Sequence, residues 1–141
     1  WIYNEIQPFI HKANKNAGWN FQWDWSESLQ FTKYKLNQHY DWHQDAWEYP
    51  YKKKDPNFNG KIRKLSVSVI LSDENDYEGG DFQIDYRHKF SDKSNYTETV
   101  KQIKPKGSVI VFPSYIWHKV APVTSGVRYS MVNWVLGQPY K

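Results

Sequence analysis

Residues 108–136 read SVIVFPSYIWHKVAPVTSGVRYSMVNWVL, and this stretch decides the expected fold class. It contains three runs that we interpret as β-strands, Ser108 to Pro113, Lys119 to Pro122 and Val127 to Leu136. Their β-branched and aromatic residues favour a pleated, half-buried surface. The last two runs are separated by the turn residues Val123-Thr124-Ser125-Gly126. Short strands joined by tight turns indicate antiparallel sheets rather than strands that alternate with helices.

The same pattern predicts four more strands upstream. They are expected at Leu29 to Leu36, Leu65 to Ser72, Asp81 to Asp85 and Thr97 to Ile103. In the second of these, Val67 and Val69 alternate with serines, as in a strand whose two faces have different surroundings. Segments rich in Gly, Pro and polar residues are expected to be loops, at Ala46 to Gly60, Asn75 to Gly80 and Ser91 to Asn95.

The N-terminal segment has a different periodicity. Apolar residues recur there at helical spacing, and Gly18 is a plausible end, so we expect one amphipathic helix that packs on the sheet: Ile2, Ile6, Phe9, Ile10, Ala13. The predicted fold is mainly β, a double-stranded β-helix (a cupin-like jelly roll) with this helix packed on it. The 141 residues are enough for one domain, expected to span 1–141. The chain opens at Trp1 rather than Met, which is compatible with a trimmed N-terminus.

The composition restricts the possible chemistry. There is no Cys, so a bound metal must be held by His and carboxylate side chains. The net charge of +4 is compatible with an acidic partner, but Lys residues cluster only at Lys52-Lys53-Lys54, which we interpret as a solvated loop. No apolar run reaches the roughly 18 residues of a membrane span. We therefore expect neither nucleic acid nor membrane as partner, and a cytoplasmic location; the sequence does not predict the number of subunits.

One local triplet and one distant His could form a metal site. In His43-Gln44-Asp45 the two ligand-type side chains are two residues apart, so in an extended strand they project to the same face. His118 lies far along the chain, just before an apolar run. Two His and one carboxylate form a facial triad, which leaves positions of an Fe(II) ion open for a co-substrate and O2. Each residue alone is as compatible with an ordinary surface or core position.

Arg128 is the second element of the expected site. If the strands around it pair antiparallel about residue 123, Arg128 lies opposite His118 and points to the same face. A buried Arg is costly unless an anion meets its donors, and a carboxylate ligand would do so bidentately. Ser130 and Trp134 share the face of Arg128 by the two-residue period, the first as a hydrogen-bond donor and the second as a wall.

From Leu29 to Leu136 these residues resemble the 2-oxoglutarate and Fe(II)-dependent oxygenases, and within them the prolyl 4-hydroxylase-like branch. The resemblance implies that His43, Asp45 and His118 hold the metal and that Arg128 binds the C5 carboxylate of 2-oxoglutarate. These four are the expected catalytic residues.

The resemblance also implies roles for further residues. It implies that Tyr34 lies beside the co-substrate and that Arg63 and Trp134 bind substrate. Ser130, on the face of Arg128, is expected beside the co-substrate too, and the aromatic residues Tyr40 and Trp47, near the triplet, are further candidates for substrate binding. The segment Glu78-Gly79-Gly80-Asp81-Phe82 is similar to a Gly-Gly turn of this branch. One departure is Val69 or Ile70, where some animal prolyl hydroxylases carry a second co-substrate tyrosine. Nucleic-acid demethylases of the superfamily carry a second arginine where this chain has Trp134, which argues against base repair.

The activity implied by the resemblance is hydroxylation of an unactivated C–H bond, of a prolyl residue in a peptide or protein. Fe(II), 2-oxoglutarate and O2 would be required, with ascorbate as a reductant and succinate and CO2 as co-products. Three alternatives stay open: the same chemistry on a free amino acid or other small molecule, a non-catalytic metal-binding cupin-like module, and a basic β-barrel that stacks nucleic-acid bases on its aromatics. Arg128 is evidence against the non-catalytic metal-binding module, because an inert metal site needs no arginine to bind a carboxylate.

Overall fold

The computed structural model describes residues 1–86 and 97–141 of the chain. The helices in these residues are α1 (Ile2–Asn16) and a 3-10 helix, η1 (Lys101–Ile103). The strands, in chain order, are β1 (Trp25–Ser26), β2 (Gln30–Tyr34), β3 (Tyr40–His43), β4 (Ile62–Ile70), β5 (Tyr77–Gly79), β6 (Phe82–Asp85), β7 (Thr97–Thr99), β8 (Val109–Pro113), β9 (Trp117–Val120), β10 (Val123–Gly126) and β11 (Arg128–Gly137). The loop predicted at Ser91 to Asn95 lies outside the described residues.

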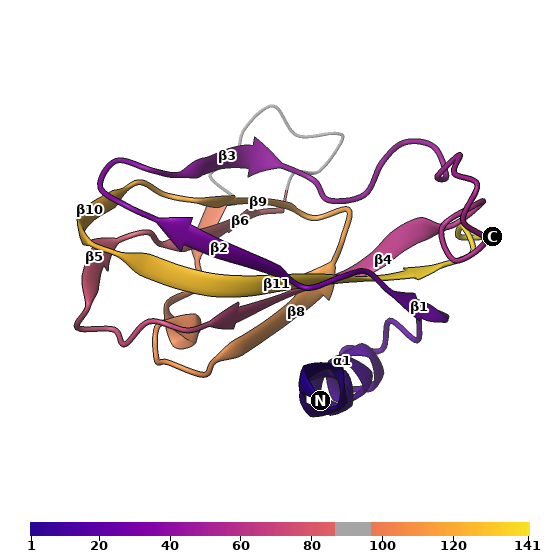
Figure 1. Ribbon diagram of the computed structural model, residues 1–141, viewed down its shortest axis with the longest axis horizontal. Helices are drawn as coiled ribbons and strands as arrows, with labels where there is room; N and C mark the ends of the chain where they lie inside the picture. Colours follow the sequence, from indigo (N-terminus) through magenta and orange to yellow (C-terminus); the bar gives the residue numbers. More distant parts are fainter. Residues whose placement is uncertain (87–96) are drawn as a thin grey trace.

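The strands form two facing layers. One sheet has the order β1-β11-β4-β8, with β2 also paired to β11, and the other has the order β3-β9-β6-β7. A two-stranded pair, β10-β5, lies at the end where the chain passes between the layers (Figure 1). Every strand pair in the described residues is antiparallel. This arrangement confirms the predicted mainly β fold, with side chains of both sheets meeting between the layers.

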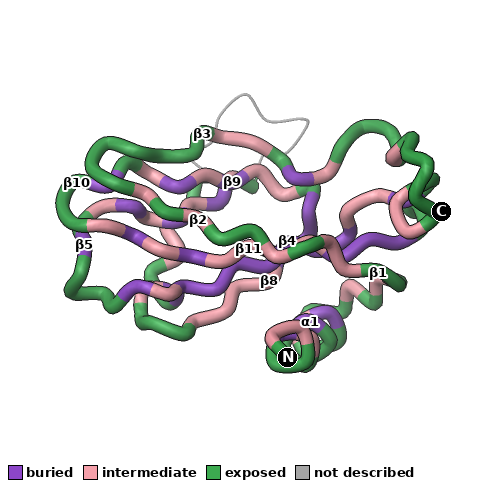
Figure 2. Tube along the Cα trace, in the orientation of Figure 1, coloured by how far each residue is buried: buried purple, intermediate pink, exposed green. Residues whose placement is uncertain are grey.

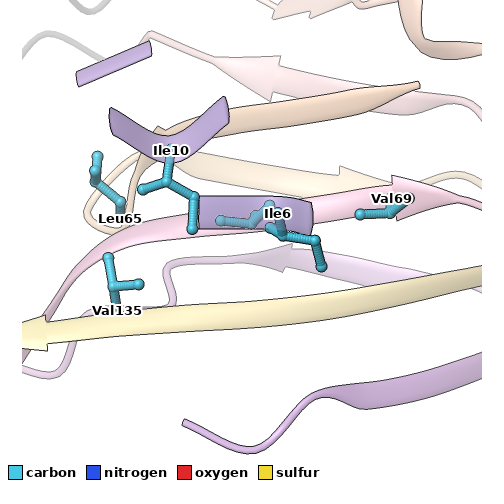
Figure 3. Packing of buried hydrophobic residues seen from close by; sticks show 6 residues of the cluster. Ile6, Ile10, Leu65, Val69 and Val135 are labelled. Atoms are coloured by element: carbon cyan, nitrogen blue, oxygen red, sulfur yellow. The ribbon is translucent and has the colours of Figure 1, made fainter. Parts of the chain in front are cut away.

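Helix α1 packs on the outer face of the larger sheet, as predicted. Ile6 and Ile10, one helical turn apart, are buried against Leu65, Val69 and Val135 (Figure 3). Burying each such side chain contributes about 1.5–3 kcal/mol relative to leaving it in water. No helix among the described residues combines the length and the apolar character needed to cross a membrane.

Strand β4 runs through the centre of the larger sheet and is buried on both faces. Leu65, Val67 and Val69 point to the α1 side, in the apolar cluster with Ile6 and Ile10. The intervening Ser66 and Ser68 are buried on the opposite face, toward the other sheet. Figure 2 shows the buried positions gathered along this part of the fold, whereas the connection from β2 to β3 is exposed. The serines of this strand therefore belong to the space between the layers.

Several predicted boundaries were wrong. The strand expected at Thr97 to Ile103 ends at Thr99, and its second half is η1, which buries Ile103 against Phe82 and Phe112. Val123 to Gly126, expected to be a turn, is the strand β10, and it pairs with β5. Strands β1, β3 and β5 were not predicted. All of these are short, and their hydrogen bonds go to partners distant in sequence, which local patterns do not reveal.

Candidate active site

Two His residues come together because β3 pairs with β9. His43 and His118 are directly opposite one another in this antiparallel pair, so their side chains leave the same face. Their ring centroids are 4.1 Å apart. Asp45 lies two residues beyond the end of β3, and its backbone N–H donates to the carbonyl of Ser114, 2.9 Å away. As a result, one ligand-type atom from each of His43, Asp45 and His118 lies within 4.8 Å of the other two.

Backbone carbonyls orient both imidazoles. The Nδ1 atom of His43 lies 2.7 Å from the carbonyl oxygen of Asp41, and that of His118 lies 2.9 Å from the carbonyl oxygen of Ile116. An Nδ1–H that donates to a carbonyl leaves Nε2 with its lone pair free to bind a metal. Both Nε2 atoms face Asp45, at 3.4 Å from Oδ1 for His43 and 3.5 Å from Oδ2 for His118. The three groups can therefore hold one metal ion.

The Asp45 carboxylate is held ionised. Its Oδ2 accepts hydrogen bonds from the indole Nε1 of Trp134 at 2.8 Å and from the hydroxyl of Ser66 at 2.7 Å. Burial acts to raise the pKa of Asp45, but the hydrogen bond with His43, the charge of His118 and these two donors lower it to about 2. Burial lowers the pKa of His118, which favours the neutral, metal-binding imidazole.

A cavity of about 230 Å³ lies between the two sheets and contains these three residues. Its size is slightly below the roughly 300–1,000 Å³ of pockets for drug-sized ligands, so it suits a small molecule. The other residues that line it are Gln30, Thr32, Tyr34, Tyr40, Arg63, Ser68, Phe82, Phe112, Val120, Arg128, Ser130, Val132 and Trp134. Of the residues expected to contact metal, co-substrate or substrate, the structure brings all but Trp47 to this cavity.

Arg128 reaches the cavity from the opposite layer. Its side chain is only 2% exposed. One guanidinium nitrogen donates to the hydroxyl of Ser130 at 3.2 Å, Tyr77 also hydrogen-bonds the group, and the ring of Tyr34 lies 5.6 Å from the guanidinium carbon. The Nε atom is buried without a hydrogen-bond partner, and no carboxylate in residues 1–86 and 97–141 forms a salt bridge with this arginine. The guanidinium therefore has donors free for an anion in the cavity.

The predicted hairpin between the strands of His118 and Arg128 was wrong. Strand β9 pairs with β3 and β6, and β11 pairs with β1, β2 and β4 in the other sheet. Because β10 pairs with β5 instead of turning back on β9, the chain passes to the other layer before Arg128. Arg128 lies opposite Tyr34 of β2 and therefore faces the two histidines across the cavity.

Comparison with known proteins identifies the family. Residues 29–136 match the sequence model of the 2OG-Fe(II) oxygenase superfamily. The chain belongs to this superfamily. The prediction made from the triad and Arg128 is thereby confirmed at the level of the family.

The curated relatives are longer than this chain. A PKHD-type hydroxylase of a Synechococcus strain is 34% identical over 108 residues, which are 77% of this chain and 41% of the relative. A PKHD-type hydroxylase of Hyphomonas neptunium is 39% identical over 71 residues, 50% of this chain and 28% of the relative. The chain thus spans about two fifths or less of these relatives.

Solved structures of the superfamily share the fold. A Pseudomonas putida prolyl-4-hydroxylase superposes with a TM-score of 0.59 at 19% identity, over 88% of this chain and 59% of that one. The viral collagen prolyl hydroxylase of Paramecium Bursaria Chlorella virus-1, in a complex with 2OG, gives 0.61 at 19% identity, over 95% and 71%. These likenesses confirm the double-stranded β-helix.

The residues present fit the cofactors that the superfamily implies, Fe(II) and 2-oxoglutarate. Two imidazoles and one carboxylate are the donor set of non-haem Fe(II) oxygenases, and they leave coordination positions open. The unpaired Nε of Arg128 fits a carboxylate at the other side of the same cavity. Burial raises the pKa of Tyr34 although the charge of Arg128 lowers it, so its hydroxyl stays neutral and can donate there.

The residues expected to bind substrate have different surroundings. Tyr40 lines the cavity mouth with its ring 3.9 Å from that of His43. Trp134 lines the cavity, but its N–H is committed to Asp45. Arg63 lines the cavity as well, and its guanidinium is bound by Glu27. Trp47 is 65% exposed and does not line the cavity, and its expected contact with substrate stays a prediction.

Sequence reasoning missed three residues that shape the site: Glu27, Ser66 and Tyr77. A serine that alternates with valines in a buried strand was a signal for Ser66, because a buried hydroxyl needs a partner. For Glu27 and Tyr77 no local signal existed. Their partners, Arg63 and Arg128, are distant in the sequence.

Proposed function

We propose that the chain is an Fe(II)- and 2-oxoglutarate-dependent dioxygenase that hydroxylates an unactivated C–H bond of a prolyl residue in a peptide or protein, with succinate and CO2 as co-products. One observation carries the proposal. Three metal-ligand side chains from one sheet and a buried guanidinium with an unpaired donor from the other line the same cavity. This combination suits a diacid that must reach a metal at one end and a cation at the other.

Each polar residue of the cavity then has a role. The Nε2 atoms of His43 and His118 and the carboxylate of Asp45 hold the iron. Arg128, helped by the hydroxyls of Ser130 and Tyr34, binds the remote carboxylate of 2-oxoglutarate. When bound, the iron would activate O2 with 2-oxoglutarate as the reductant: one oxygen atom ends in succinate as CO2 leaves, and the other is inserted into the C–H bond.

The apolar residues keep the metal region dry and bind the substrate ring. Phe82 and Phe112 pack against His118, with ring centroids 5.7 Å and 4.7 Å from it. A site that excludes water protects reactive species from side reactions. At the mouth, Tyr40 and Trp134 offer aromatic faces to the saturated ring of a proline. The PKHD-type hydroxylases and prolyl hydroxylases among the relatives support this substrate.

The activity is tested by succinate release from 2-oxoglutarate, with Fe(II), ascorbate, air and proline-containing peptides. We expect the amount of succinate released to equal the amount of peptide that gains one oxygen, and both to be lost in Asp45→Ala. Free proline and other small molecules belong in the same assay, because turnover of these alone would replace the peptide by a small substrate. Calorimetry with Mn(II) separates the remaining case: metal binding without 2-oxoglutarate binding would indicate a non-catalytic metal module.

A further inference from the structure

Arg63 lines the cavity but is already bound by a carboxylate of the chain. Its Nε donates to Oε1 of Glu27 at 2.7 Å and a terminal nitrogen donates to Oε2 at 3.0 Å. The two side chains are 15% and 13% exposed, so the ion pair is largely shielded from water. A bidentate pair of this kind matches the geometry that a guanidinium would offer to a carboxylate ligand.

Glu27 is fixed in place by three further contacts. Tyr51 donates its hydroxyl to Oε1 at 3.1 Å. The backbone N–H of Glu27 donates to the carbonyl of Trp134 at 2.9 Å, and its carbonyl accepts from the amide of Asn133 at 2.8 Å. Glu27 itself does not line the cavity. It therefore binds Arg63 from outside the cavity. The guanidinium carbon of Arg63 also lies 3.9 Å from the centroid of the Trp134 ring.

The pair removes one positive charge from the substrate end of the cavity. Of the cavity-lining residues in the described part of the chain, only Arg63 and Arg128 are Arg or Lys. The proposed function assigns Arg128 to 2-oxoglutarate. Burial acts to lower the pKa of Arg63, but the hydrogen bonds and the charge of Glu27 raise it, so Arg63 remains a cation whose charge Glu27 balances. A substrate carboxylate thus has no uncompensated cation to bind.

We propose that Glu27 is a specificity-determining residue: by occupying Arg63 it rejects substrates with a carboxylate on the reacting residue and selects a neutral residue inside a peptide chain. The inference rests on the proposed function and names its substrate class. It replaces the expected role of Arg63 as a direct grip on the substrate. An added carboxylate must compete with Glu27 for the same donors and would leave Glu27 buried without its partner, which is costly.

The test compares two small probes that differ only in charge. N-acetyl-L-proline carries a carboxylate, and N-acetyl-L-prolinamide is its neutral analogue. Binding is measured by calorimetry on the whole chain loaded with Mn(II) and excess 2-oxoglutarate, so that Arg128 is occupied and no turnover occurs. The wild type should prefer the amide. Glu27→Gln keeps a similar shape and should shift the ratio of the two affinities toward the acid by roughly tenfold or more, since it frees a charged donor.

Matched variants separate specificity from a loss of structure. Asp24→Asn removes another ion pair of the same segment, the more exposed one with Lys61 at 2.7 Å, and should leave the ratio unchanged. Glu27→Ala should shift the ratio in the same direction as Glu27→Gln if the fold survives. Glu27→Gln combined with Arg63→Gln should cancel the shift.

Two results would overturn the inference, and they are distinguishable. If the amide binds but the ratio is the same in wild type and Glu27→Gln, Glu27 does not set specificity, although the proposed function stands. If neither probe binds to any variant, the prolyl substrate is wrong and the inference falls with it.

Discussion

Replacing Gly80 by Ala should displace Arg128. Gly80 has φ +61°, and a Cβ added to it would lie 2.8 Å from Cδ of Arg128 and 3.2 Å from Cγ2 of Val123. Both neighbours are fully buried, so neither can move freely. The left-handed backbone costs a non-glycine residue about 1–2 kcal/mol. Overpacking a filled core adds about 1–3 kcal/mol.

The expected result is a selective defect in the co-substrate end of the site. Gly80→Ala should lower the free energy of unfolding by about 2–5 kcal/mol. A shifted guanidinium loses alignment with the diacid, so 2-oxoglutarate should bind roughly tenfold more weakly. Mn(II) affinity should change less, because the added Cβ would meet Arg128, Val123 and Tyr77 and none of the three metal-ligand side chains.

Gly18→Ala provides the matched control. Gly18 has a similar φ of +70°, and an added Cβ would meet nothing within 4 Å. It therefore carries the backbone strain without the collision. Thermal unfolding and calorimetric titration of both variants with 2-oxoglutarate, in the presence of Mn(II), measure the difference. The reasoning is refuted if Gly80→Ala unfolds at the temperature of Gly18→Ala and binds 2-oxoglutarate like the wild type.

Three further changes test the other parts of the site. Arg128→Gln should weaken 2-oxoglutarate binding by roughly a hundredfold while Mn(II) binding persists, since it removes charge-assisted hydrogen bonds of about 1.5–3 kcal/mol; calorimetry with each ligand checks both. Trp134→Phe removes one of the two donors to Asp45 and should lower Mn(II) affinity roughly 10–100-fold, and unchanged affinity would contradict the role of this indole. In the metal-free chain, the pKa of Asp45 lies at about 2 instead of 3.8, which contributes about 2 kcal/mol of stability. Because the folded pKa is the lower one, this contribution is present above about pH 4 and is lost as the pH falls toward 2; urea unfolding between pH 2 and 6 should show the slope, and Asp45→Asn should flatten it.

Only part of the metal triad is local. His43 and Asp45 are two residues apart, so strand periodicity suggested a shared face for them. His118 was added as the second His of a facial triad and through the family resemblance, and its position opposite His43 depends on the β3-β9 pairing, which no local pattern shows. Arg128 was expected in the cavity and lines it, but the reason given was wrong. The predicted hairpin with His118 does not exist, and the two residues face each other from different sheets.

The partners of the site residues could not be predicted, because they depend on contacts across the sheets. Glu27 and Arg63 are 36 residues apart, and nothing in either local sequence indicates the pair. The same applies to β3, whose four residues form a strand by pairing with β9. Because the pair with Glu27 could not be predicted, Arg63 was expected to contact substrate. In the structure the carboxylate of Glu27 binds its guanidinium.

Asp45 is the member of the triad that connects the two layers. His43 and His118 belong to the β3-β9 pair and are oriented by carbonyls of their own segments. The Asp45 carboxylate is instead held by Trp134 of β11 and Ser66 of β4, both in the opposite sheet. The relative position of the sheets therefore fixes the third ligand, and Arg128 on β11 moves with that same sheet. One sheet supplies both the hydrogen bonds to the Asp45 carboxylate and the Arg128 guanidinium, whereas the other supplies the two histidines, so the distance between the metal ligands and Arg128 depends on how the two sheets pack.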